Sequence, residues 1–173
     1  MKHLSLTQIA ALLEAPESPR NRLFLKMVYE HGFRVSEALA LTPSRVKNGF
    51  LVTRPQKNGK TTTQKLQFTT LLLWNEFTKN LQPNTRLFPF TRQWASAIFH
   101  EAAKKAGITL SPKQGIHTLR HSLAHHLLDS GAPLPVVQRK LGHRSLASTG
   151  AYLLASDDEA DQWTAKVLEQ EAV

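Results

Sequence analysis

The chain has 173 residues, of which 41% are hydrophobic and 20% charged, as expected for one globular domain with a buried core. Its formal net charge of +9 favours an anionic partner, and 13 Lys or Arg against two acids lie between residues 38 and 128, whereas residues 156–173 carry six acids and one lysine. The absence of cysteine excludes disulfides, thiol catalysis and thiolate metal sites, and fits a reducing cytoplasm. No apolar run approaches the roughly 20 residues of a membrane span, and the N-terminus lacks a signal-peptide core.

The N-terminal part of the sequence predicts three helices. A capping box of Ser and Gln begins a helix over residues 5–13, and Pro19 begins a second helix that ends at Gly32. A third helical stretch runs over residues 34–41. Arg34 therefore stands at a helix start directly after a glycine stop, where its backbone is held firmly.

Residues 45–68 have β character. Residues 47–49 read Lys-Asn-Gly, a hairpin signal, and residues 50–53 form a β-prone run. A second strand is expected within residues 61–68. The polar turn at residues 56–60 lies between them and would project from the sheet.

The rest of the sequence predicts helices separated by glycines. They are expected from Thr69 or Thr70 to about Leu81, from Thr91 to Gly107, from His117 to Ser130, from Pro133 to Leu141, from Ser145 to Leu154, and from about Asp157 onward. The predicted fold class is α+β, mostly helical with one small antiparallel β-sheet.

Six side chains suited to phosphodiester chemistry follow one another in the sequence: Arg34, Lys57, His117, Arg120, His143 and Tyr152. Cationic and imidazole groups can neutralise a phosphodiester, and a tyrosine hydroxyl can attack it. Each residue alone is a weak signal, since surface arginines, solvated lysines and core tyrosines are common. Glu37, one helical turn after Arg34, is expected either to hold the guanidinium or to cap the helix.

A histidine series offers a competing interpretation. His117, His121 and His125 are spaced four apart and would share one helix face, as metal ligands do. No carboxylate or cysteine ligand accompanies them, and the Glu of a His-Glu-x-x-His motif is missing. No metal is therefore expected; His121 is expected to support the site, and His125 and His126 to be ordinary helix residues.

Order and spacing together carry a resemblance. Gly32-Phe33-Arg34-Val35-Ser36-Glu37-Ala38-Leu39 is similar to the first arginine box of the tyrosine recombinase (phage integrase) family, which includes the Xer and fimbrial-switch types. Ile116-His117-Thr118-Leu119-Arg120-His121 resembles the second box. Leu141-Gly142-His143-Arg144-Ser145 followed by Ala151-Tyr152 resembles the third box and the nucleophile. The resemblance extends over nearly the whole chain.

The resemblance implies site-specific cutting and rejoining of double-stranded DNA through a 3′-phosphotyrosine intermediate. Arg34 and Arg120 would clamp the scissile phosphate, and Tyr152 would attack it. His117 would assist proton transfer, and His143 would hydrogen-bond a non-bridging oxygen.

The resemblance also assigns a general acid to the polar turn. Lys57 is preferred for protonating the departing 5′ oxygen because it lies earliest in the turn, with Lys60 as the alternative. Covalent attachment stores the energy of the broken bond, so neither a cofactor nor a metal is expected.

The expected organisation is a single catalytic domain over residues 1–173, without the N-terminal core-binding domain of larger family members. Residues 156–173 are expected to form an acidic C-terminal helix or tail that docks on a neighbouring subunit, folds back on its own domain or is disordered. The resemblance implies a tetramer on DNA.

Two alternative functions stay open: DNA relaxation like that of type IB topoisomerases, and a non-catalytic DNA-binding accessory protein. Candidate base-reading residues are Arg92, Gln93, Lys113 and Gln114.

Overall fold

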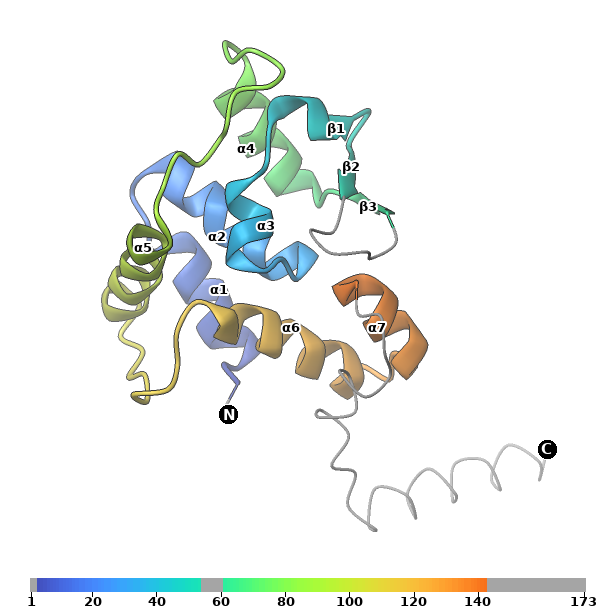
Figure 1. Cartoon of the computed structure of the whole chain (residues 1–173). Coiled ribbons are helices and arrows are strands. Elements are labelled where there is room, and N and C mark those ends of the chain that lie inside the picture. Colours follow the sequence, from blue (N-terminus) through green and yellow to red (C-terminus); the bar gives the residue numbers. More distant parts are fainter. Residues whose placement is uncertain (1–2, 54–60, 143–173) are drawn as a thin grey trace, which may run out of the picture.

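A computed structural model describes residues 3–53 and 61–142. The small sheet lies at one edge of a mainly helical molecule, and α6 and α7 lie side by side below it in the view of Figure 1. The elements are α1 (Leu6–Glu14), α2 (Pro19–His31), α3 (Val35–Leu39), a 3₁₀ helix (Pro43–Arg45), β1 (Val46–Lys47), β2 (Phe50–Thr53), β3 (Thr62–Lys65), α4 (Phe68–Thr78), α5 (Arg92–Lys105), α6 (His117–Asp129) and α7 (Leu134–Leu141). The predicted mostly helical α+β class is confirmed.

The first two helices begin as the sequence predicts, and the second also ends as predicted. The Ser5 hydroxyl accepts a hydrogen bond from the Gln8 amide at 3.2 Å, and the Gln8 side chain accepts one from the Ser5 amide at 2.9 Å. Pro19 occupies the first turn of α2, and Gly32 ends the helix with a left-handed φ of 62°. The chain therefore turns sharply just before Arg34.

The sheet is antiparallel with strand order β1-β2-β3. Asn48 and Gly49 join β1 to β2 with φ angles of 51° and 78°, the two positive values that a tight hairpin turn needs. This confirms the predicted hairpin. The strand register pairs Phe50 with Lys65 and Thr53 with Thr62. The predicted polar turn between β2 and β3 lies outside the described residues.

Two helix starts differ from the prediction. Helix α3 covers Val35–Leu39 rather than residues 34–41, because Arg34 is its extended N-cap and Ala40 leaves the helical conformation. Helix α4 begins at Phe68, before either threonine that was predicted to cap it. Thr70 lies inside this helix, where its buried hydroxyl donates to Glu30 at 2.8 Å; the threonine serves packing between α2 and α4 instead of a cap.

The later helices match their predicted stops. Thr91 caps α5 by accepting from the Trp94 amide at 3.1 Å. Gly107, Gly131 and Gly142 follow α5, α6 and α7 with left-handed φ angles of 67°, 83° and 64°. The helices predicted over residues 145–154 and from residue 157 lie outside the described residues.

The hydrophobic core joins most of these elements. Its fully buried side chains include Leu12, Phe24, Leu51, Phe99 and Leu119, which come from α1, α2, β2, α5 and α6. A smaller cluster of Leu123, Ala124, Val137 and Leu141 packs α7 on α6. This second cluster fixes the end of α7, the point from which the third box begins.

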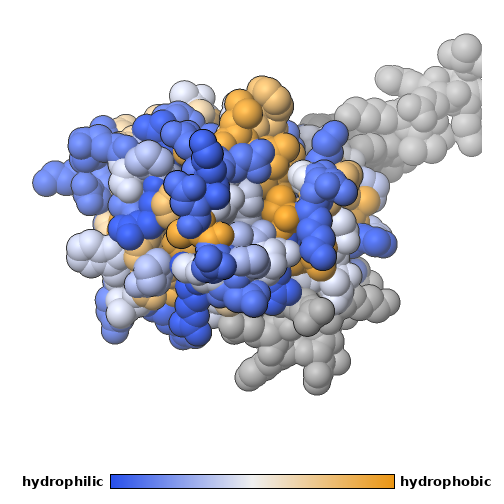
Figure 2. All heavy atoms as spheres, turned by 90° about the horizontal axis from the view of Figure 1, so that it is seen from above, coloured by the Kyte–Doolittle hydropathy of each residue, from blue (hydrophilic) through white to orange (hydrophobic). Residues whose placement is uncertain are grey.

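The face of the molecule seen in Figure 2 is mainly polar. Figure 2 shows hydrophilic residues over most of one face, with hydrophobic residues gathered in a band through its middle. Within residues 3–53 and 61–142, no helix combines the length and apolar character needed to cross a membrane.

Candidate active site

Arg34 is oriented by the helix that it begins. Its backbone amide donates to Glu37 Oε2 at 2.8 Å, and its guanidinium donates to Glu37 Oε1 at 3.1 Å. Glu37 therefore does both things expected of it: it caps α3 and holds the arginine. The Arg34 side chain remains 54% exposed. A half-exposed, tethered guanidinium is well placed to meet an anion from solvent.

Arg120 connects two boxes that are far apart in sequence. It lies on α6 with only 8% of its surface exposed. Its guanidinium donates to the carbonyl oxygen of Gly32 through Nη1 and to that of Leu141 through Nη2, the latter at 2.9 Å. These carbonyls stand two residues before Arg34 and two before His143. The second box thus brings the beginnings of the first and third boxes together.

His117 lies on the same helix as Arg120, three residues earlier, and its side chain is exposed. Its ring meets that of His121 edge-on, with the centroids 5.7 Å apart. Burial lowers the pKa of His121, and electrostatic repulsion from the neighbouring His117 and Arg120 lowers it further. A neutral His121 beside His117 fits the supporting role expected of it.

His126 has a more definite role than an ordinary helix residue. Its Nε2 donates to the Leu4 carbonyl at 2.9 Å, and its Nδ1 accepts from the Tyr29 hydroxyl at 2.8 Å. The Leu4 amide in turn donates to the Ser122 hydroxyl at 2.9 Å. The His125 ring stacks on the His3 ring, with the ring centroids 4.4 Å apart. These contacts attach the N-terminal segment to α6, and the described residues hold no group of three or more side chains suited to binding a metal ion.

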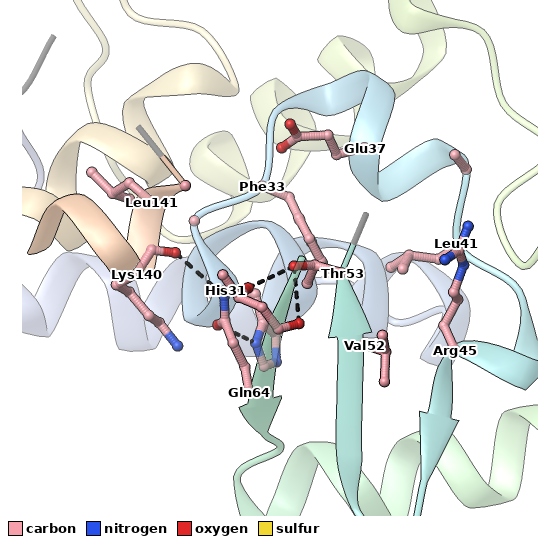
Figure 3. Close-up of a pocket in the computed structure, with 14 residues that line it drawn as sticks. His31, Phe33, Glu37, Leu41, Arg45, Val52, Thr53, Gln64, Lys140 and Leu141 are labelled. Atoms are coloured by element: carbon pink, nitrogen blue, oxygen red, sulfur yellow. Dashed lines mark hydrogen bonds between the residues drawn. The ribbon is translucent and has the colours of Figure 1, made fainter. Parts of the chain in front are cut away.

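A pocket opens between the first box, the sheet and the end of α7 (Figure 3). Phe33 and Glu37 line it from the first box, Gln64 from β3, and Lys140 and Leu141 from α7. Arg34, His117 and Arg120 are not among its lining residues. The pocket therefore lies beside the predicted phosphate-binding side chains and shares their backbone supports.

Sequence reasoning missed three polar residues in this pocket: His31, Gln64 and Lys140. Figure 3 shows His31 and Gln64 side by side between α7 and the sheet. His31 Nδ1 and Gln64 Oε1 are 2.9 Å apart, and Gln64 Nε2 donates to the Lys140 carbonyl at 3.3 Å. His31 directly precedes the first box and Lys140 the third, which is a sequence signal; nothing in the sequence singles out Gln64.

Three of the six predicted catalytic residues, Arg34, His117 and Arg120, lie in the described part of the chain. Lys57, its alternative Lys60, His143 and Tyr152 lie outside the described residues. Of the candidate base-reading residues, Gln114 is a correction. It is 7% exposed and its side chain accepts from the Ser111 amide at 2.7 Å, so it braces the loop before α6.

The chain is similar in sequence and in fold to known recombinases. Tyrosine recombinase XerD of Pseudomonas putida is 36% identical to the chain over 87% of it and 56% of the relative. The crystal structure of XerA recombinase has a TM-score of 0.78 at 23% identity, covering 96% of this chain and 65% of that one. XerH site-specific recombinase, bound to its difH substrate before cleavage, has a TM-score of 0.76 at 24% identity, covering 95% and 54%.

These structures share the fold predicted here, that of tyrosine recombinase catalytic domains. The chain spans 56% of the length of the XerD relative. The model described as Phage integrase family matches residues 2–159, which include all three boxes and Tyr152. The chain therefore belongs to the phage integrase family.

Proposed function

We propose that the chain is a site-specific recombinase that cuts and rejoins double-stranded DNA through a 3′-phosphotyrosine intermediate. The observation that carries the proposal is the pair of hydrogen bonds from Arg120 to Gly32 and Leu141, which unites the starts of the first and third boxes. The relatives named tyrosine recombinases and the DNA-bound XerH structure support it.

In the proposed reaction, the Tyr152 hydroxyl oxygen bonds to the scissile phosphorus and the bond to the 5′ oxygen breaks. His117 assists removal of the tyrosine proton, and Lys57 supplies a proton to the departing 5′ oxygen. Arg34 and Arg120 balance the negative charge that builds up on the phosphate, where each donor typically contributes about 10²–10³ in rate. Attack by a 5′ hydroxyl reverses the step and releases the tyrosine.

The proposal extends to assembly. Exchange between two DNA sites needs four cleaved strands, so we propose a tetramer on DNA, with residues 156–173 docking in trans or in cis.

The proposal also covers domain organisation and location. We propose that residues 1–173 form one catalytic domain and that the protein works in the cytoplasm.

The proposal is tested with a pool of DNA duplexes. Each duplex has a randomised central sequence and a nick in one strand next to that sequence. Cleavage then releases a short fragment and traps the covalent adduct. The chain is incubated with the pool in EDTA and run on a denaturing gel. We expect a protein–DNA band in EDTA, because all the proposed catalytic groups are side chains. The band should be absent from Tyr152→Phe, because phenylalanine lacks the attacking hydroxyl.

Other outcomes identify the alternatives. Retarded DNA in a native gel without any covalent band would overturn the catalytic proposal and favour a DNA-binding accessory protein. A covalent band accompanied by relaxation of supercoiled plasmid, without exchange between two selected sites, would indicate an activity like that of type IB topoisomerases.

A further inference from the structure

Three polar residues form a continuous bridge between elements that lead to different parts of the candidate active site. His31, the last residue of α2, is only 2% exposed, and its Nδ1 lies 2.9 Å from Gln64 Oε1 on β3. Gln64 Nε2 donates to the Lys140 carbonyl on α7 at 3.3 Å. We refer to these contacts as the His31–Gln64–Lys140 bridge (Figure 3).

The bridge uses both ends of one amide. Since Gln64 Nε2 donates to Lys140 and also lies 3.5 Å from the Thr62 hydroxyl, Gln64 Oε1 is the end that accepts from His31. His31 therefore carries its proton on Nδ1. Burial, reinforced by the charge of Lys140, lowers the pKa of His31 to about 4, so the bridge is uncharged near neutral pH.

The surrounding charges are arranged across the same elements. Lys140 is half-buried and faces Glu30 of α2; burial lowers the pKa of Lys140 and raises that of Glu30, while their mutual attraction opposes both shifts. Thr70 of α4 donates to Glu30 at 2.8 Å. The bridge thus lies in a packed polar layer, where a hydrogen bond fixes geometry more firmly than it does in solvent.

The bridge joins strand β3 to two helices. Within the described residues it is an edge strand that pairs only with β2. Its ladder hydrogen bonds fix it relative to the sheet, but they leave its position relative to α2 and α7 unspecified. Gln64 joins it to both helices at once.

The sequence shows what the three elements carry. His31 stands three residues before Arg34, Lys140 stands three before His143, and β3 follows the segment that contains Lys57. We propose that the bridge is a positioning device that fixes β3 relative to α2 and α7, which lead into the first and third boxes, and that the lysine of the segment preceding β3 acts as general acid only when β3 is held in this way. The inference rests on the proposed function and adds His31 and Gln64 as positioning residues.

The test compares two leaving groups. In one suicide substrate the scissile 5′ oxygen is native, and in the other it is replaced by sulfur. A thiol has a pKa of about 8.5, far below that of an alcohol, so the sulfur departs without a general acid. Single-turnover adduct formation is measured for wild type, Gln64→Leu and the shape-conserving Gln64→Glu on both substrates, using a site selected by the wild-type chain.

We expect both variants to lose about 10-fold to 10²-fold in rate on the native substrate, and to come within about threefold of wild type on the sulfur substrate. DNA affinity in a native gel should stay unchanged. Thr63→Val, on the opposite exposed face of the same strand, is the matched control and should behave as wild type on both substrates. His31→Asn, whose amide nitrogen replaces Nδ1, should keep most of the activity that His31→Leu loses.

The inference is overturned if the Gln64 variants lose activity equally on both substrates, which would indicate a merely structural role, or if they lose none. Failure of the proposed function has a different signature. In that case the wild-type chain itself forms no adduct with either substrate, and the positioning role falls with it.

Discussion

The guanidinium of Arg120 donates a hydrogen bond to the carbonyl oxygen of Gly32, a residue 88 positions earlier in the chain. A side chain proposed to bind phosphate is thus also part of the support for the loop that presents Arg34. Loss of Arg120 should therefore disturb the site in two ways, by removing a charge and by releasing the first box.

Arg120→Lys separates these two effects, because lysine keeps the charge but cannot span two carbonyl oxygens. We expect the free energy of unfolding to fall by about 1–3 kcal/mol, as buried hydrogen bonds to a charged group are lost. Urea denaturation followed by circular dichroism measures this change. Arg139→Lys, at an exposed position of α7, is the control and should stay within about 0.5 kcal/mol of wild type. Equal stability of the two variants would contradict the bridging role of Arg120.

Gly32→Ala should destabilise the protein more than the same change at Gly107. Both glycines have similar φ angles, 62° and 67°, so both variants incur a backbone cost of about 1–2 kcal/mol. At Gly32, the added methyl would also lie 2.6 Å from Leu141 Cδ2 and 3.2 Å from Leu123 Cδ2, whereas at Gly107 it meets nothing within 4 Å. We expect about 1 kcal/mol of extra loss at Gly32, measured by urea denaturation. An equal loss of stability at both positions would contradict the predicted clash, because it would show that the Leu141 and Leu123 side chains move aside at no cost.

His31 should make stability fall in acid. Its pKa is about 4 when folded and about 6.5 when unfolded, so between these values the unfolded chain binds the proton first. The stabilising contribution is complete above pH 6.5 and declines as pH falls toward 4, by at most roughly 3 kcal/mol. Comparing urea denaturation of wild type and His31→Asn at pH 7 and pH 4.5 isolates it. The variant should lose less stability than wild type; a parallel loss would contradict the assignment.

Glu37→Gln should affect activity more than stability. The amide keeps an oxygen that can accept from the Arg34 backbone but loses the charge that holds the guanidinium. We expect less than about 1 kcal/mol of lost stability, since the glutamine keeps the helix cap and the ion pair is open to solvent on its Arg34 side. We also expect about a 10-fold slower adduct formation at saturating DNA. Glu101→Gln removes a more exposed ion pair with Lys105 on α5 and should leave the rate unchanged.

Local signals in the sequence were sufficient for most of the secondary structure. The Ser5–Gln8 capping box, the Asn48-Gly49 turn and Gly32 depend on neighbours within a few residues, and the structure confirms all three. The start of α4 was predicted wrongly because the side chain of Thr70 is used in a contact with Glu30, 40 residues away. Propensity carries no information about such a contact.

The candidate site shows the same division. The boxes around Arg34 and Arg120 were recognisable from their order and spacing, and the structure joins them through the hydrogen bond from the Arg120 side chain to the Gly32 carbonyl. The bridge through Gln64 was not predictable, because a glutamine in a short polar strand looks like any solvated residue. Its partners lie 33 residues earlier and 76 residues later, and only the tertiary fold brings them to it.

The attachment of Leu4 has a mechanical consequence. Its amide and carbonyl are both hydrogen-bonded by side chains of α6, the helix that carries His117 and Arg120. Force applied at the N-terminal end of the chain would therefore act first on α6, the helix that supports the phosphate-binding boxes, before it reached the sheet.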